Sequence, residues 1–120
     1  MIFIYMEFSI EEYKKLLDRT LSSKYSFIES VDVNSLKIRL GLLHGDFTIT
    51  LKNGTMKGMT PECKEKYEKG DRVSYWVMAS CFRRKFNLVK IERDIESMFW
   101  DLYGVTTKNL GVIKTDYILN

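Results

Sequence analysis

The spacing of apolar residues changes near residue 25, and this change constrains the fold more than any other feature. Between Ile10 and Leu21 apolar side chains recur every three or four positions, as on one face of an amphipathic helix. From Tyr25 onward short apolar runs alternate with polar residues, which is the period of a half-buried strand. The chain has 120 residues and no linker-like stretch rich in proline, glycine or serine. We therefore expect one α+β domain, residues 1–120.

The helix that begins near Ile10 carries its own start signal. Ser9 followed by Glu12 forms a capping box, in which each side chain accepts a hydrogen bond from an otherwise unsatisfied backbone N–H. Phe8 and Tyr13 are spaced for a hydrophobic staple. We expect this helix to pack by one face on the rest of the domain and to be structural.

Turn residues divide the rest of the chain into short strands. His44-Gly45-Asp46 and Asn53-Gly54 have the composition of turns. The polar stretch Thr60–Gly70 is either a connection or one short helix. Together these signals predict a small antiparallel β-barrel or curved sheet. Its strands are expected at residues 25–31, 36–40, 47–51, 72–79, 86–92 and near the end of the chain.

A second helix is expected after these strands. Asp94 can cap it, Ile95 and Phe99 share one face, and Gly104 ends it. Trp100 falls on a different side of this helix. It is either the edge of the core or an anchor for a protein partner, since tryptophan is enriched at interface hot spots.

Positive charge is concentrated in the middle of the chain. Residues 52–93 contain eleven Lys or Arg and five Asp or Glu, whereas the whole chain has a net charge of +3. Such a segment suits an anionic partner, although a solvated basic face has the same composition. At the tip expected between the strands 72–79 and 86–92, cations lie between aromatic residues. Cations bind phosphate and aromatic rings stack on unpaired bases, so the candidate nucleic-acid-binding residues are Trp76, Phe82, Arg83, Arg84, Lys85 and Phe86.

Three stretches occur in an order that carries a family resemblance. They are Phe47–Gly54 with its Asn-Gly turn, Lys69–Val73 with its Gly-Asp-x-Val pattern, and Arg83–Glu92. In this order they resemble the OB-fold barrels of the initiation-factor-one and TRAM type. The likeness covers residues 36–103, including the helix after the barrel. It implies an OB-like barrel that binds RNA or single-stranded DNA.

Catalytic motifs are not recognisable in the chain. His44 is the only histidine, and with Asp46 it forms either a His-Asp pair or simply a turn. Cys63 and Cys81 lack the Cys-x-x-Cys spacing of a zinc site. We therefore expect no enzyme, metal or cofactor. Two cysteines are also few for a secreted domain of this size, so we expect free thiols and a cytoplasmic protein. The apolar run Met1–Met6 is too short for a signal peptide or a membrane span.

The sequence thus predicts a non-catalytic domain that binds RNA or single-stranded DNA through the basic tip at Arg83, Arg84 and Lys85. A second hypothesis is a protein-interaction module, an inhibitor or adaptor, that binds its partner through the Trp100 helix or an exposed strand edge. A third and weaker one is an enzyme that uses His44 and Asp46.

Overall fold

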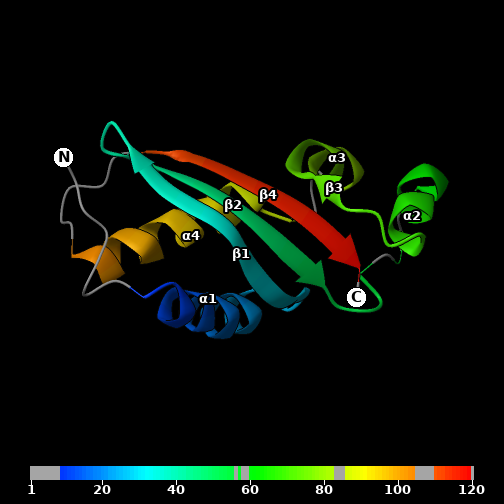
Figure 1. Cartoon of the computed structure of the whole chain (residues 1–120). Coiled ribbons are helices and arrows are strands. Elements are labelled where there is room, and N and C mark those ends of the chain that lie inside the picture. Colours follow the sequence, from blue (N-terminus) through cyan, green and yellow to red (C-terminus); the bar gives the residue numbers. More distant parts are fainter. Residues whose placement is uncertain (1–8, 56, 58–59, 83–85, 105–109, 120) are drawn as a thin grey trace.

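The computed structural model describes residues 9–55, 57, 60–82, 86–104 and 110–119, and these form an open four-stranded sheet with helices (Figure 1). The α+β class is confirmed. The sheet has the order β1-β2-β4-β3 and does not close, so the expected barrel is not formed. In chain order the elements are α1 (Ile10–Lys24), β1 (Ile28–Arg39), β2 (Leu42–Leu51), α2 (Pro61–Glu68), β3 (Val73–Ser74), α3 (Tyr75–Cys81), α4 (Leu88–Tyr103) and β4 (Val112–Leu119).

Helix α1 begins where the sequence predicts. The Glu12 N–H donates to the Ser9 hydroxyl at 3.3 Å, which confirms the N-cap, while the expected staple residue Phe8 lies outside the described residues. The apolar face buries Tyr13, Leu17 and Leu21 completely. The helix is therefore held by packing, as its period indicates.

Strands β1 and β2 form a long antiparallel hairpin with a two-residue turn at Leu40-Gly41. Both turn residues have positive φ, 53° and 74°, as a turn that follows the twist of the strands requires. The turn expected at His44-Gly45-Asp46 is wrong, because these residues lie within β2. Gly45 has a packing reason instead: a Cβ there would overlap the ring of Phe47.

The last strand, β4, is confirmed, but it runs parallel to β2. Its register pairs His44 with Val112 and Leu51 with Leu119. Adjacent parallel strands need a long crossover, and here the connection from β2 to β4 contains α2, β3, α3 and α4. The sheet is therefore mixed rather than antiparallel.

The expected hairpin of strands 72–79 and 86–92 is wrong. Only Val73–Ser74 is a strand, α3 follows at once, and residues 88–92 are the first turns of α4. Asn87, not Asp94, caps α4, because its side chain accepts the Lys90 N–H at 3.1 Å. The predicted end at Gly104 is confirmed, with φ 85°. Of the two alternatives for Thr60–Gly70, the short helix is correct and forms α2.

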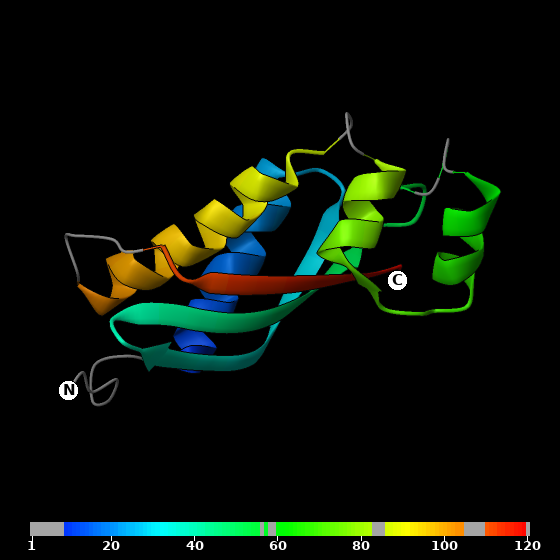
Figure 2. The ribbon, with the colours of Figure 1, turned by 90° about the horizontal axis from the view of Figure 1, so that it is seen from above.

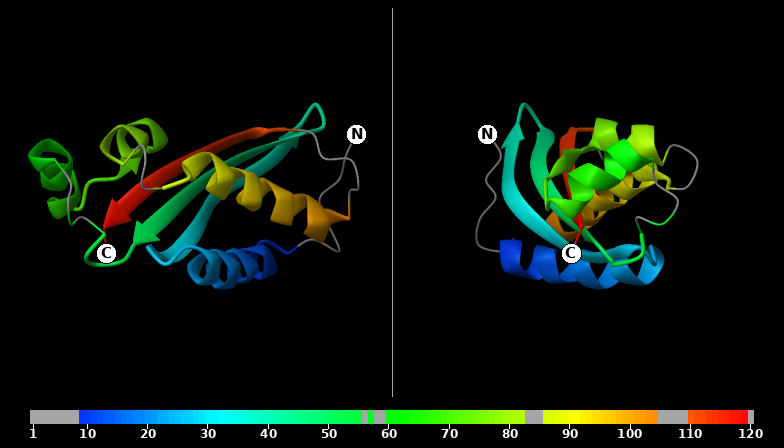
Figure 3. Two further views of the ribbon diagram at one scale, coloured as in Figure 1. Left: turned by 180° about the vertical axis from the view of Figure 1, so that it is seen from behind. Right: turned by 90° about the vertical axis from the view of Figure 1, so that its right-hand side faces the viewer.

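The core lies between one face of the sheet and the helices α1 and α4, as Figure 3 shows from behind. Tyr13 packs edge-on against Phe47 and Phe99, with ring centroids 6.3 and 5.7 Å apart. The opposite sheet face carries polar side chains such as Thr48 and Thr50 and has no helix packed flat across it (Figure 2).

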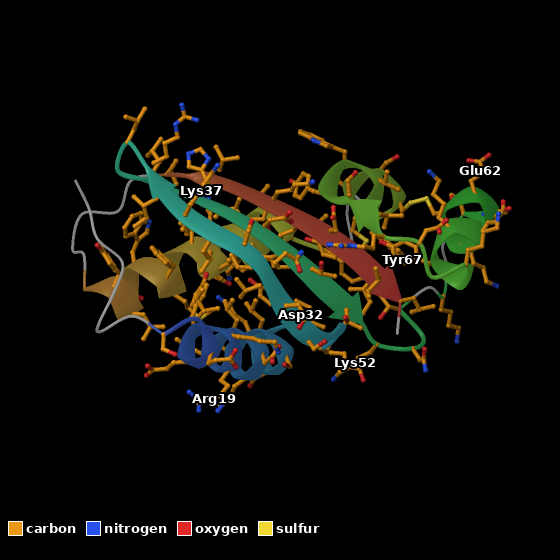
Figure 4. All side chains as sticks on the ribbon, in the orientation of Figure 1. Arg19, Asp32, Lys37, Lys52, Glu62 and Tyr67 are labelled. Atoms are coloured by element: carbon orange, nitrogen blue, oxygen red, sulfur yellow. A yellow bond between two sulfur atoms is a disulfide. The ribbon has the colours of Figure 1, made fainter. Side chains whose placement is uncertain are left out.

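Helices α2 and α3 lie together at one end of an elongated molecule of 48 × 24 × 22 Å (Figure 1). A disulfide between Cys63 and Cys81 joins them, with Cα atoms 6.3 Å apart (Figure 4). The expectation of free thiols is therefore wrong. The reason is that α2 and α3 bring together two residues that lie 18 positions apart in the chain. In the described part of the chain, no helix is long and apolar enough to cross a membrane.

Candidate interaction groove

One edge of strand β4 lacks a neighbouring strand along its first half. β3 pairs only with Asp116 and Tyr117, and the chain then leaves the sheet to form α3. Among the described residues, the stretch Val112–Thr115 therefore has β2 on one side and no strand on the other. Because alternate residues of a strand direct N–H and C=O to each side, this edge offers hydrogen-bonding groups to an incoming chain.

Two adjoining hollows follow this edge, and we call them together the β4 groove. The first, about 470 Å³, lies between β4 and the start of α3, with Tyr75 and Trp76 in its lining. The second, about 380 Å³, lies between β4 and α4, with Val89 and Glu96 in its lining. Glu92 and Ile113 line both hollows. The groove therefore extends along the whole unpaired stretch.

Two carboxylates from successive turns of α4 lie in the lining of the groove. Glu96 is 6% exposed, and both its oxygens accept the Gly111 N–H at 3.1 Å. Glu92 accepts the Thr115 hydroxyl at 2.7 Å through Oε1. These bonds fasten the start of β4 to α4. Val89, Glu92 and Glu96 follow one side of α4, since residues three, four and seven apart lie on one side of a helix. This side adjoins the core face, because Glu96 and Trp100, four residues later, are both buried.

Burial raises the pKa of Glu92, and the hydrogen bond from Thr115 lowers it in part. Desolvation disfavours the charged carboxylate, and among the described residues no cation forms an ion pair with it. Arg93 and Lys114 line the same groove without pairing with Glu92. Glu92 is therefore a half-buried acid that a cation from outside would stabilise in its charged form.

Exposed apolar side chains are concentrated at the groove. Soluble domains tolerate single exposed apolar residues, but a group of them beside an unpaired strand edge is typical of an interaction surface. Of the six large apolar side chains that are exposed in the described part of the chain, four line the groove: Trp76 (78%), Val89 (48%), Leu110 (75%) and Val112 (58%).

A third hollow, of about 510 Å³ between α2 and β4, contains cations and adjoins the first, since Ser74 and Lys114 line both. Lys66, Arg72 and Lys114 line it together with two aspartates, Asp71 and Asp116. Arg72 is already engaged: its Nη2 lies 3.3 Å from Asp116 Oδ2, and it donates to the Thr48 hydroxyl. The positive charge of this hollow is thus partly neutralised within the protein.

Three of the six nucleic-acid-binding residues predicted from the sequence, Trp76, Phe82 and Phe86, lie in the described part of the chain. Arg83, Arg84 and Lys85 lie outside the described residues. Phe82 is 6% exposed, and the partly buried Phe86 packs against Phe27 at a tilt, with ring centroids 3.9 Å apart, so both aromatics contact the core. Of the whole predicted set, Trp76 alone among the described residues presents an exposed ring.

The other predicted residues also have clear positions. Trp100 is 2% exposed and packs against Phe99, so its side chain belongs to the core and does not line the groove. His44 and Asp46 lie two residues apart on β2, and no hydrogen bond joins them. No group of three His, Cys, Asp or Glu that could hold a metal occurs in the described part of the chain.

Sequence reasoning missed Glu92, Glu96 and Gly111. Their signal is weak but present: two glutamates four residues apart beside an apolar helical stripe, and a glycine just before the final strand. Comparison with protein-family models, with curated proteins and with solved structures gives no match to this chain.

Proposed function

We propose that this chain is a non-catalytic protein-interaction domain that binds an extended segment of a partner as an added strand on the free edge of β4. In this mode, main-chain hydrogen bonds supply affinity and pockets for alternate side chains supply specificity. The β4 groove offers both, because its hollows flank the unpaired stretch Val112–Thr115.

The observation that carries this proposal is the coincidence of an unpaired edge with exposed apolar residues. Proteins usually protect such edges with charges, proline or a covering element. Lys114 is the only charged residue on the stretch Val112–Thr115, and Val112 and Leu110 beside it are exposed. Burial of the groove side chains under an added strand would contribute about 25 cal/mol for each Å² of apolar surface. An interface this short is of the weak, transient kind.

The test is a selection of random peptides displayed on phage against the immobilised full chain. Peptides of about eight residues span roughly 27 Å when extended, which is enough for the groove. Selected peptides are then titrated by fluorescence anisotropy, each beside a copy with N-methyl groups on alternate residues. We expect N-methylation on one set of alternate residues to abolish binding, because it removes the donors that face β4.

Matched protein variants locate the site. Val112→Lys and Trp76→Ala should each weaken the selected peptides at least about tenfold, since both residues line the groove. Ile10→Lys is the control, because Ile10 is 51% exposed on α1, which packs beside β1 at the other edge of the sheet. The absence of any selected peptide, or an equally large effect of the control variant, would overturn the proposal.

Binding of RNA or single-stranded DNA is the second candidate function. One observation favours it: the exposed Trp76 lies on α3, beside the hollow lined by Lys66, Arg72 and Lys114. A ring of this kind stacks on a base while nearby cations contact phosphate. The test is an anisotropy titration with single-stranded RNA and DNA at two salt concentrations.

The variant for this test is the triple alanine replacement of Arg83, Arg84 and Lys85. If the basic segment binds phosphate, the dependence of log affinity on log salt should fall by about 0.7 for each phosphate group that the variant no longer neutralises. An unchanged affinity and slope would remove these residues from the site. Tight oligonucleotide binding without peptide selection would favour this second function over the first.

A further inference from the structure

We infer that the partner strand carries a basic side chain that enters the groove at Glu92 and, next to it in sequence, an acidic side chain that faces Lys114. This inference rests on the proposed strand addition. It follows from side-chain direction along β4 and from the charges on its two faces.

The direction of the β4 side chains is fixed by a contact. Thr115 bonds to Glu92 at 2.7 Å, so its side chain points toward α4. Side chains alternate along a strand, so Ile113 points the same way, while Val112 and Lys114 point to the open sheet face. A strand added beside β4 shares this pleat. Its alternate residues therefore enter the groove beside α4, and the residues between them lie beside Lys114.

The groove side is suited to a cation. Glu92 lines both hollows, and only its Oε1 has a hydrogen-bond partner among the described residues. Glu96, one turn further along α4, already uses both oxygens on Gly111. An incoming Lys or Arg would thus find one carboxylate that is half-buried and forms no ion pair with a described residue. Charge pairing of this kind chooses among partners more than it adds affinity.

The open side is suited to an anion. Lys114 is exposed, and it forms no ion pair with a described residue, although Asp116 lies two residues further on the same face. Asp116 is instead paired with Arg72 at 3.3 Å. An acidic residue opposite Lys114 would form a cross-strand ion pair, which is favourable, whereas a second cation there would repel it.

Two peptides of identical composition test the inference. The probe is acetyl-Thr-Val-Lys-Glu-Val-Thr-amide, and the control is acetyl-Thr-Lys-Val-Glu-Val-Thr-amide. In the probe the Lys and Glu fall on opposite faces of the added strand in either direction and in any register, whereas in the control they fall on the same face. We expect the probe, with its Lys in the groove, to bind the wild-type chain about tenfold more tightly than the control.

Protein variants separate the charge effect from the fold. Glu92→Gln, which keeps an acceptor for Thr115, should reduce the preference for the probe to about threefold, because Lys114 still favours the Glu of the probe. Glu92→Lys should remove the preference altogether, because repulsion between the probe's Lys and the new lysine offsets the attraction between its Glu and Lys114. Circular dichroism and urea unfolding confirm that both variants are folded before titration.

The outcomes distinguish this inference from the function on which it rests. If N-methylation abolishes binding but both peptides bind equally, strand addition stands and the charge preference is overturned. If selected peptides bind but neither of these two binds at roughly millimolar concentration, where the free energy of binding is only about 4 kcal/mol, the inference is overturned and strand addition stands; if no peptide is selected either, both are overturned. If the full tenfold preference persists in Glu92→Gln, Glu92 does not contribute to it, and the inference is overturned.

Discussion

The two tryptophans of this chain occupy opposite environments. Trp76 is 78% exposed on α3, whereas Trp100 is 2% exposed on α4 and packs against Phe99 at 5.1 Å between ring centroids. The same substitution at each tryptophan therefore compares the effect of losing an indole from the surface with that of losing one from the core. The difference also decides which tryptophan a partner reaches without unfolding the domain.

Truncation of each tryptophan should therefore have separate effects. Trp100→Ala should lower the free energy of unfolding by about 3–5 kcal/mol, because it leaves a large cavity in the core. Trp76→Ala should change it by less than about 0.5 kcal/mol. Urea unfolding measures both. Iodide should quench only part of the tryptophan fluorescence of the wild-type chain, because only Trp76 is exposed. In the Trp76→Ala variant iodide should quench almost no fluorescence. Strong quenching in this variant would show that Trp100 is at the surface.

Gly111 is required by close packing rather than by backbone conformation. A Cβ at this position would overlap the carbonyl oxygen of Leu43 on β2, and backbone atoms do not move easily. Gly111→Ala should lower the free energy of unfolding by about 2 kcal/mol or more. Gly54→Ala is the control: its site is open, but its φ of 90° makes alanine strained by about 1 kcal/mol. Equal decreases in the free energy of unfolding of the two variants, measured by urea unfolding, would contradict this role of Gly111.

The pH dependence of stability should show the raised pKa of Glu92. Burial raises the pKa of this carboxyl above its ordinary value of 4.5, so the folded state binds the proton more tightly than the unfolded chain. The stability that protonation contributes is present below the ordinary pKa and is lost as pH rises through the folded pKa.

Glu92→Gln removes this titration and keeps an acceptor for Thr115. The free energy of unfolding of the variant, relative to that of wild type, should therefore be larger at pH 7 than at pH 4, two values on either side of the ordinary pKa of 4.5. Urea unfolding at both values measures the difference. A constant difference between variant and wild type would show that Glu92 has the same pKa in both states.

Among the elements, α2 depends most on a covalent link. It contributes one core residue, Tyr67, whose hydroxyl lies 2.9 Å from the Met78 sulfur on α3, and the disulfide Cys63–Cys81 joins the same two helices. The disulfide closes a loop of 18 residues, and the chain-entropy model assigns such a loop about 3 kcal/mol. The position of α3, which carries Trp76, is therefore linked to the state of these cysteines.

Two measurements check the disulfide. The chain unfolded without reductant should contain no thiol that reacts with a labelling reagent. The Cys63→Ser/Cys81→Ser variant should lose about 3 kcal/mol of unfolding free energy, and reductant should have no further effect on it. Recovery of two thiols from the untreated chain would show that the cysteines are free.

Elements with an unambiguous local signal are predictable from the sequence. The Ser9 cap and the apolar stripe of α1 mark a helix, and β4 is rich in the β-branched and aromatic residues that favour a strand. The failure at residues 72–92 also has a physical cause. Val73, Tyr75 and Val77 alternate as in a strand, but α3 begins at Tyr75 because tertiary packing overrides this short-range preference. The apolar segment at the start of α4 is short enough to be a strand as well, and only the helical spacing of apolar residues that continues to Ile95 favours a helix.

The groove itself is not predictable from the sequence, because it is a property of the whole molecule. Its walls come from α3, α4 and β4, and its free edge exists only because the chain turns into α3 after Ser74. A single sequence indicates which segments form strands, but it does not determine which strand has an unpaired edge. The groove residues Glu92 and Val112 are 20 positions apart and meet only through the crossover.

The place of β4 in the sheet also has a consequence for synthesis of the chain. β4 is the last of the four strands to be made, yet it lies between β2 and β3. While a ribosome is still translating the residues after Tyr103, the β1–β2 hairpin and α1 are available to fold, but β3 has no strand to join. The sheet is completed only through contacts between residues distant in sequence, which form slowly. In that interval the inner edge of β2 is unpaired on the nascent chain, and unpaired strand edges of this kind are prone to aggregation.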